Sequence, residues 1–165
     1  MSQINKCLFP VAGYGTRFLP VTKAIPKEML PILTKPLIQY GVEEAMSAGM
    51  TGMAMVTSKY KQAIENHFKP HKDIESSLKG TAKESLLDEV NHASSVCDFT
   101  YIEQQEMLGL GHAIYTGKPL IGDEPFAVIL ADDLIHHKKG AVKQMVEVFD
   151  YYKSSVIAVQ KVEGP

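Results

Sequence analysis

Short apolar runs alternate along this chain with longer segments of helical periodicity, and no other feature of the sequence restricts its possible folds as much. The runs expected to form strands cover residues 7–11, 53–57, 99–103, 126–135 and 154–162. The expected core helices cover residues 36–48, 61–68, a stretch that opens after residue 111, and 140–152. Strands that alternate with helices form a mostly parallel sheet with helices on both faces. An α/β fold is therefore expected, with ligands beyond the carboxyl ends of its strands.

Three segments carry more specific expectations. Pro36 is expected at the first position of its helix and Gly49 at the end of it. Residues 73–92 are polar with scattered apolar side chains, which predicts one or two exposed helices outside the core. The run 126–135 is strongly apolar and ends in carboxylates, so it is expected in the middle of the sheet.

Length and composition limit the class of protein. The 165 residues, of which 45% are apolar and 22% charged, suit one globular domain with a single core. No apolar stretch reaches the ~18 residues of a membrane span, and the N-terminus lacks the pattern of a signal peptide. Cys7 and Cys97 lack the spacing of a disulfide framework or a zinc site, which suits a reducing compartment. A cytoplasmic protein without a membrane partner is expected.

The net charge of the chain limits how it could bind an anion. A formal net charge of −2 argues against a protein that binds nucleic acid through its overall field. Any anion site must therefore be local.

The segment "VAGYGTRFLPVTKAIPKEMLP", residues 11–31, is the strongest candidate for such a site. Gly13, Gly15 and Thr16 follow the first expected strand, where backbone N–H groups could approach an anion closely. The segment is not a P-loop, because no Gly-Lys-[Ser/Thr] follows. It is not the dinucleotide fingerprint either, because Phe18 occupies the position of the third glycine. A simple tight turn is the alternative that the two glycines alone leave open.

The rest of the same segment favours a binding role. Its prolines fix φ and should hold the backbone open instead of letting it form a helix. Arg17, Lys23 and Lys27 would then be presented on a stiff loop, and such a set of cations suits a polyphosphate.

A pair of carboxylates after a later strand forms a second candidate site. Asp132 and Asp133 end the run 126–135, and a carboxylate at that place can hold Mg²⁺ that bridges phosphates. Adjacent strand residues point to opposite faces, so the two carboxylates cannot both bind one metal ion in a simple way.

Gly109 and His112 lie where a helix begins, and such a place suits the binding of an anion or a sugar hydroxyl. His112 is expected either to contact a sugar or to serve as a structural cap.

The stretch "AGYGTRFLPVTKAIPKEMLPILTKPLIQY" resembles the signature of bacterial UTP–glucose-1-phosphate uridylyltransferases. The resemblance continues through "IENHF", "LLDEV", "EQQEMLGLGHA" and "GDEPFAVILADDL", and so runs from about residue 7 to the end of the chain. It implies a Rossmann-like nucleotide-diphospho-sugar transferase fold. It also implies that the family's domain continues beyond the last residue, so that residues 1–165 would be the nucleotide-binding part of a single domain, with homo-oligomers formed by the longer relatives.

The resemblance further implies how a nucleotide would be held. Backbone at Ala12, Gly13 and Gly109 and the side chain of Gln104 would recognise uracil, although Gln105 leaves the register open by one residue. An amide suits this task because it can donate to O4 and accept from N3–H. Glu28 would orient either the ribose or the lysines.

The same resemblance gives a reaction and its catalytic groups. Uridylyl transfer from UTP to α-D-glucose 1-phosphate would give UDP-glucose and pyrophosphate. Asp132 matches the family's metal-binding aspartate and would hold Mg²⁺, Arg17 would contact the leaving pyrophosphate, and Lys27 the phosphates near the reacting centre. Asp133 is then expected to face solvent or to support Asp132.

Other functions remain open at this point. They are a UTP-binding module without turnover, a related transferase for another base or sugar, and a Rossmann-like dehydrogenase domain. Phe18 and the pair Thr57-Ser58 argue against the dehydrogenase, which needs a third glycine and an acidic residue at these places.

Overall fold

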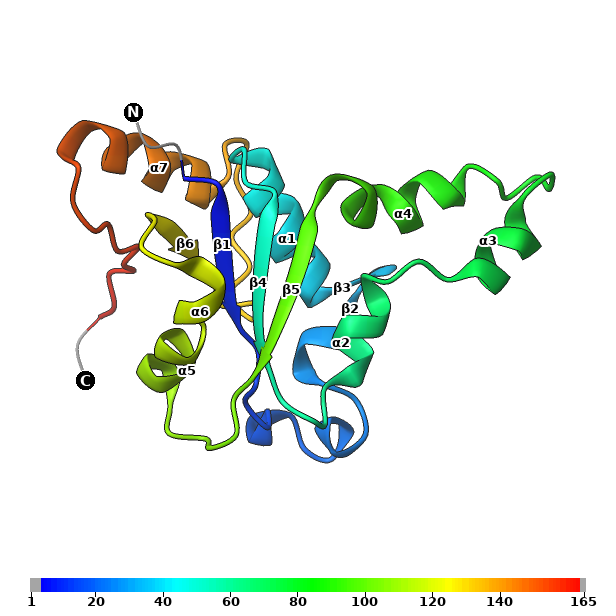
Figure 1. Ribbon diagram of the computed structural model, residues 1–165, viewed down its shortest axis with the longest axis horizontal. Coiled ribbons are helices and arrows are strands. Elements are labelled where there is room, and N and C mark those ends of the chain that lie inside the picture. The colour runs from blue at the N-terminus through cyan, green and yellow to red at the C-terminus, as the bar shows by residue number, and fades with distance from the viewer. Residues whose placement is uncertain (1–3, 164–165) are drawn as a thin grey trace.

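The computed structural model describes residues 4–163 and has a parallel β-sheet at its centre (Figure 1). The four strands lie in the order β5-β4-β1-β6, and every pairing between neighbours is parallel. Their bounds are β1 Lys6–Pro10, β4 Gly52–Thr57, β5 Asp98–Glu103 and β6 Phe126–Val128. This arrangement confirms the expected α/β class.

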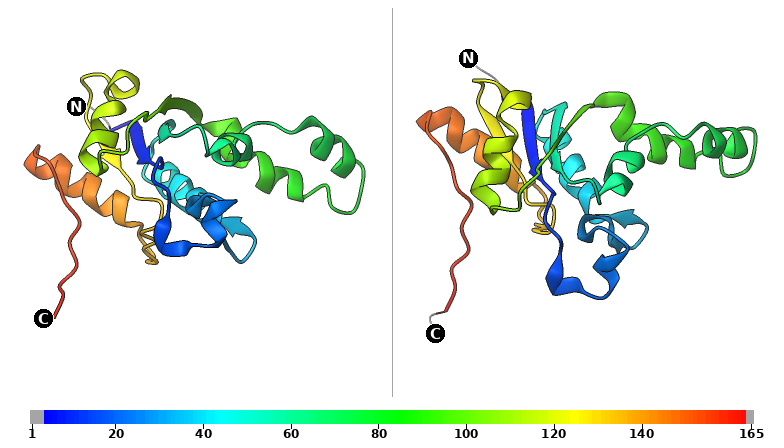
Figure 2. Two further views of the ribbon diagram at one scale, coloured as in Figure 1. Left: turned by 90° about the horizontal axis from the view of Figure 1, so that it is seen from below. Right: turned by 60° about the horizontal axis from the view of Figure 1, so that its bottom comes forward.

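Helices cover both faces of the sheet, as Figure 2 shows along a second direction. Helices α1 and α7 pack together on one face, while α5 and α6 contact strands on the other. The helices are α1 Leu37–Ser47, α2 Gln62–His67, α3 Lys72–Leu78, α4 Leu86–Val96, α5 Leu110–Thr116, α6 Lys118–Ile121 and α7 Ala141–Tyr152. Helices α3 and α4 project away from the sheet, which confirms the expected excursion from the core (Figure 1).

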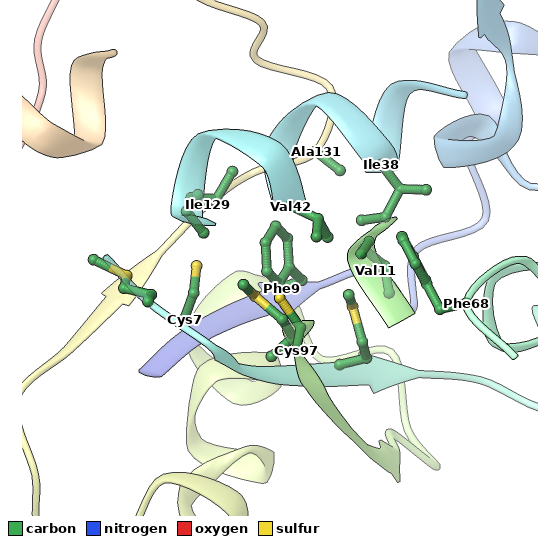
Figure 3. Packing of buried hydrophobic residues seen from close by; sticks show 14 of the residues in the cluster. Cys7, Phe9, Val11, Ile38, Val42, Phe68, Cys97, Ile129 and Ala131 are labelled. Carbon is green, nitrogen blue, oxygen red and sulfur yellow. The ribbon is translucent and has the colours of Figure 1, made fainter. Parts of the chain in front are cut away.

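The two faces are built by strict alternation along β1. Cys7 and Phe9 point into the larger cluster, which includes Ile38 and Val42 of α1, whereas Leu8 points into the smaller cluster against α5 and α6. All five of these side chains are fully buried, and Figure 3 shows the larger cluster. Because side chains alternate across a strand, a run with no polar residue must be covered on both sides.

The segment between β1 and α1 contains more regular structure than expected. It forms three 3₁₀ turns followed by a small antiparallel hairpin of β2 and β3. The turns are η1 Thr16–Phe18, η2 Val21–Lys23 and η3 Lys27–Met29, and the hairpin strands are Pro31–Ile32 and Lys35–Pro36. Pro36 therefore precedes α1 as its cap and is not the first helical residue, while Gly49 follows the helix with a φ of 91° as expected of a stop.

Two predictions about strands are wrong. The run 126–135 forms only the three-residue strand β6, at the edge of the sheet and not in its middle. Its backbone keeps one more bond to β1, from Ile129 N to Leu8 O, and then bends at residues 130–133. Within the described residues nothing pairs with its outer edge, which leaves Phe126 and Val128 more than a third exposed.

The second wrong prediction concerns residues 154–162, which form no strand. Ile157 and Val159 are 81% and 89% exposed there. β-branched residues favour a strand only where a neighbouring edge and a surface for packing are available. Here the segment pairs with no strand, although the outer edge of β6 is unpaired within the described residues.

Candidate functional site

The candidate site lies where the carboxyl ends of the parallel strands meet. The segment after β1, the turn after β4, the residue after β5 and the bend after β6 all belong to this end of the sheet. In Figure 1 the first of these segments is the blue loop at the lower end of the sheet. Parallel α/β sheets bind their ligands at this end.

The loop after β1 is folded tightly on itself at Gly15. This residue has a φ of 68°, and a Cβ added there would lie 3.1 Å from Lys27 Cβ and 3.2 Å from Thr22 Cγ2. Thr22 Oγ1 also donates a hydrogen bond of 2.9 Å to the Gly15 carbonyl. A glycine is needed here both for its backbone conformation and for the close approach of Lys27.

Lys27 and Asp132 form the centre of the site. Lys27 Nζ lies 2.7 Å from Asp132 Oδ2, and Arg17 Nη2 lies 3.9 Å from the same oxygen. Burial alone would raise the pKa of Asp132, but the hydrogen bond and charge of Lys27, aided by Arg17, bring it below its ordinary value. Asp132 is therefore held as a carboxylate between two cations, and the exposed Arg17 remains available to an incoming anion.

The position of Asp132 is set by the core beneath it. Ile129 and Ala131 are buried in the larger cluster, and Asp133 N donates to Leu130 O across the bend. The bend directs Asp132 toward Lys27 and leaves Asp133 exposed, which agrees with the expectation that only one of the two carboxylates faces the site.

A second ion pair lies beneath the loop. Lys61 Nζ lies 2.6 Å from Glu28 Oε2, and the two side chains are only 5% and 1% exposed. Burial raises the pKa of Glu28 and lowers that of Lys61, while each partner's charge and their hydrogen bond act in the opposite direction. Of the two expected roles for Glu28, the geometry shows contact with a lysine, and that lysine is Lys61.

Sequence reasoning missed Lys61. A lysine just before a helix usually indicates a solvated side chain, and its partner is 33 residues away in the chain. The nearest signal is the position of Lys61 directly after the turn that ends β4, a strand whose carboxyl end had to reach the site.

Gln104 is buried just beyond β5 and is paired with His112. The Gln104 side chain is 4% exposed, its Nε2 lies 2.8 Å from His112 Nδ1, and its backbone N donates to Thr57 O at 2.8 Å. An amide N–H donates, so the ring Nδ1 is the acceptor in this contact. Gln105 is exposed, so the glutamine fixed at this edge of the sheet is Gln104.

The remaining predicted residues lie beside backbone that is accessible to a ligand. Ala12 is buried at the end of β1, whereas a Cβ added at Gly13 or Gly109 would meet no atom within 4 Å. Gly109 has a φ of 94° and precedes α5. Thr16 is exposed on η1 and, with Ser58 and Lys61, lines a hollow of about 390 Å³ between the loop and the turn after β4.

The predicted residues therefore fall into separate contact groups. Arg17 and Lys27 both contact Asp132, Glu28 contacts Lys61, and Gln104 contacts His112. Across residues 4–163 the structure shows no group of three or more His, Cys, Asp or Glu placed to hold a metal ion. In the same part of the chain, no helix is long and apolar enough to cross a membrane.

Fold and site together define an α/β protein with a cationic loop at the carboxyl ends of its parallel strands, facing one carboxylate. The family model for nucleotidyl transferases matches residues 10–165 of this chain. The chain belongs to the nucleotidyl transferase family.

Similar proteins agree with this assignment. The UTP–glucose-1-phosphate uridylyltransferase of Pseudomonas aeruginosa is 53% identical over 161 residues, which are 96% of this chain and 58% of the relative. A crystal structure of apo UDP-glucose pyrophosphorylase superimposes with a TM-score of 0.85 at 55% identity, covering 91% of this chain and 56% of that one. A UDP-glucose pyrophosphorylase complexed with UDP-glucose superimposes with a TM-score of 0.77 at 52% identity, covering 91% and 55%. The chain thus spans a little over half the length of these proteins.

Proposed function

We propose that this chain provides the UTP-binding site for uridylyl transfer to α-D-glucose 1-phosphate, with UDP-glucose and pyrophosphate as products. The observation that carries the proposal is the cluster of Lys27, Arg17 and Asp132 at the carboxyl ends of the strands. The names of the similar proteins support the choice of UTP and glucose 1-phosphate. Residues 1–165 would then be the nucleotide-binding part of a nucleotidyltransferase domain.

The proposed reaction needs no general base. A phosphate oxygen of glucose 1-phosphate is already anionic and forms the new bond to the α-phosphorus of UTP. The bond from that phosphorus to the bridging oxygen breaks, and the electron pair leaves with pyrophosphate. Catalysis of such a step consists of alignment and of charge stabilisation where the negative charge shifts.

The cations of the loop would supply that stabilisation. Lys27 contacts the phosphates near the reacting centre, and Arg17, whose side chain is 86% exposed, reaches the leaving pyrophosphate. Gly15 lets Lys27 pack against the loop, and Thr16 with the open backbone at Gly13 completes the phosphate cradle. A rigid cradle of this kind loses little conformational entropy when it binds.

Asp132 is the residue that would hold Mg²⁺. It is a carboxylate at the edge of the site with a side chain that is 26% exposed, and Mg²⁺ is commonly bound by one or two carboxylates together with substrate phosphates. The bound ion would neutralise charge on the phosphates. Lys27 contacts only Oδ2 of Asp132, so the other carboxylate oxygen could bind the metal ion. Substrate phosphates would then supply the remaining ligands.

The uracil end is assigned to the β5 edge. Gln104 would hydrogen-bond the base, with backbone at Ala12, Gly13 and Gly109 beside it, and His112 would hold the Gln104 amide in one orientation through their 2.8 Å contact. This favours an orienting role for His112 over contact with the sugar.

Location and assembly complete the proposal. The thiols of Cys7 and Cys97 are both buried and unpaired, which supports a cytoplasmic location. Homo-oligomerisation stays a prediction that light scattering at several protein concentrations would test.

Release of pyrophosphate from UTP and glucose 1-phosphate in the presence of Mg²⁺ tests the reaction. The assay compares this chain with a version extended to the length of its relatives. In the longer version we expect release that requires the sugar phosphate and falls when Lys27 is replaced by alanine. UTP binding without release would instead support a nucleotide-binding module, which one observation favours: among the described residues, Asp132 is the only carboxylate that contacts the loop's cations Arg17 and Lys27. Neither binding nor release would reject both functions.

A further inference from the structure

Lys61 is a buried cation that the proposed reaction does not use. Its side chain is 5% exposed, lies at the start of α2, and contacts Glu28 beneath the cationic loop. Resting on the proposed function, we propose that Lys61 is a positioning residue: by holding Glu28, it fixes the turn that presents Lys27 to the nucleotide phosphates.

The turn η3 is anchored through each of its three residues. Lys27 reaches Asp132, Glu28 reaches Lys61, and Met29 packs against the larger core cluster. The backbone is closed by hydrogen bonds from Met29 N to Pro26 O and from Leu30 N to Lys27 O. Three neighbouring side chains thus point to three separate supports, so loss of the middle support frees the residue that meets the phosphates.

The backbone of Lys61 is fixed by hydrogen bonds to the turn after β4 and to the first turn of α2. Its backbone N donates to Ser58 O at 2.9 Å in the turn that follows β4, and Ile64 N donates to Lys61 O at 3.0 Å in the first turn of α2. Ile64 is fully buried in the larger cluster. The chain of contacts therefore runs from the core through Lys61 and Glu28 to the loop.

The charges of the two ion pairs also act on each other. Burial lowers the pKa of Lys61 and Glu28 raises it, and the charges of Lys27 and Asp132 contribute further in opposite directions. Without Lys61, the carboxylate of Glu28 would be left buried beside Lys27 and would compete with Asp132 for it.

A contribution to folding stability does not by itself explain the ion pair of Lys61 and Glu28. Buried ion pairs commonly add little to stability relative to well-packed apolar residues, because desolvation offsets the attraction between the charges. What a short, directional pair supplies is geometry, and here it joins segments 33 residues apart directly beneath the proposed phosphate cradle.

The test compares UTP affinity with folding stability in two variants of the same helix. Lys61→Met removes the ammonium and keeps the length of the side chain, whereas Ile64→Ala removes core packing and leaves the pair intact. Affinity for UTP with Mg²⁺ is measured by titration calorimetry at a temperature where circular dichroism shows both variants folded. We expect about tenfold weaker binding for Lys61→Met and less than about twofold change for Ile64→Ala.

Each outcome decides the matter. Equal affinity of Lys61→Met and the unmodified chain, or equal losses in both variants, would overturn the positioning role. Failure of the unmodified chain to bind UTP would reject the proposed function instead. If Lys61→Met does not fold, Lys61→Gln, which keeps a shorter donor for Glu28, takes its place with the same expectation and the same contrary results.

Discussion

Lys27 and Asp132 are 105 residues apart in the chain, yet Lys27 Nζ lies 2.7 Å from Asp132 Oδ2. The contact joins the loop after β1 to the bend after β6, and β1 and β6 are neighbouring strands of the sheet. It brings the residue proposed to meet phosphate next to the residue proposed to hold a metal ion. The site is thus partly assembled by protein contacts alone.

Replacement of Lys27 by methionine should weaken UTP binding far more than folding. A charge-assisted hydrogen bond to phosphate contributes ~1.5–3 kcal/mol, so affinity should fall roughly tenfold to a hundredfold. Loss of a partly exposed ion pair should lower the free energy of unfolding by at most ~1 kcal/mol. Calorimetry and urea unfolding measure the two effects.

Lys35→Met is the matched control for this experiment. Lys35 also belongs to a partly buried pair, with Glu43 at 2.9 Å, but it lies in the hairpin before α1. It should change stability by a similar amount and leave UTP affinity within about twofold. A loss of affinity as large as that of Lys27→Met would contradict the assignment of Lys27.

Replacement of Asp132 by asparagine should remove the effect of Mg²⁺ on UTP binding. Without the carboxylate, binding measured with Mg²⁺ should approach that measured with EDTA. Asp133→Asn is the control, because Asp133 is exposed and adjacent, and its response to Mg²⁺ should equal that of the unmodified chain. If both variants kept a normal response, Asp132 would not be the metal ligand.

Replacement of Gln104 by leucine should reduce discrimination between UTP and CTP. The two bases differ in the groups at positions 3 and 4, which an amide can distinguish by hydrogen bonds, and each such bond contributes ~1 kcal/mol or more. Gln105→Leu, at the exposed neighbour, should leave the ratio of the two affinities unchanged. Competition binding with both nucleotides gives the ratio, and an unchanged ratio in Gln104→Leu would place base recognition elsewhere.

How far the sequence predicts this fold depends on where a strand lies. The bounds of β1, β4 and β5 agree with the expected runs to within a residue. The continuous apolar runs of β1 and β4 reflect burial on both faces in the middle of the sheet, whereas β5 lies at an edge and its side chains are exposed or half-buried. The run 126–135 was equally apolar, but Ala131, further along it, is buried in a bend and not in a ladder. Hydropathy records burial and does not record which backbone conformation achieves it.

The candidate site shows the same limit. Lys27 and Asp132 could be singled out because a glycine turn and a strand end mark them in the sequence. Lys61 could not, because only its tertiary contact with Glu28 distinguishes it from an ordinary surface lysine. The choice between Gln104 and Gln105 likewise depended on burial, which two adjacent identical residues cannot reveal.

Replacement of Tyr101 by phenylalanine should protect the fold at alkaline pH. Burial, aided by the charge of Glu65, raises the pKa of Tyr101 from 10.0 to about 12, and its hydroxyl is buried without a hydrogen-bond partner. A pKa raised in the folded state gives stability that is present below pH 10 and lost as the pH rises toward 12. At pH 11 this loss should be on the order of 1 kcal/mol and should be absent from the variant.

Urea unfolding at pH 8 and pH 11 measures the difference. The buried thiols of Cys7 and Cys97 also have raised pKa values, but they are present in both proteins and cancel in the comparison. Parallel losses in Tyr101→Phe and the unmodified chain would show that the tyrosine does not titrate differently on folding.

Calorimetric titration of the chain with UTP, in the presence of Mg²⁺, tests the central claim most directly. The account predicts one UTP per chain, bound more tightly than ATP or CTP and displaced by UDP-glucose. Absence of binding, or equal affinity for UTP and ATP, would contradict it.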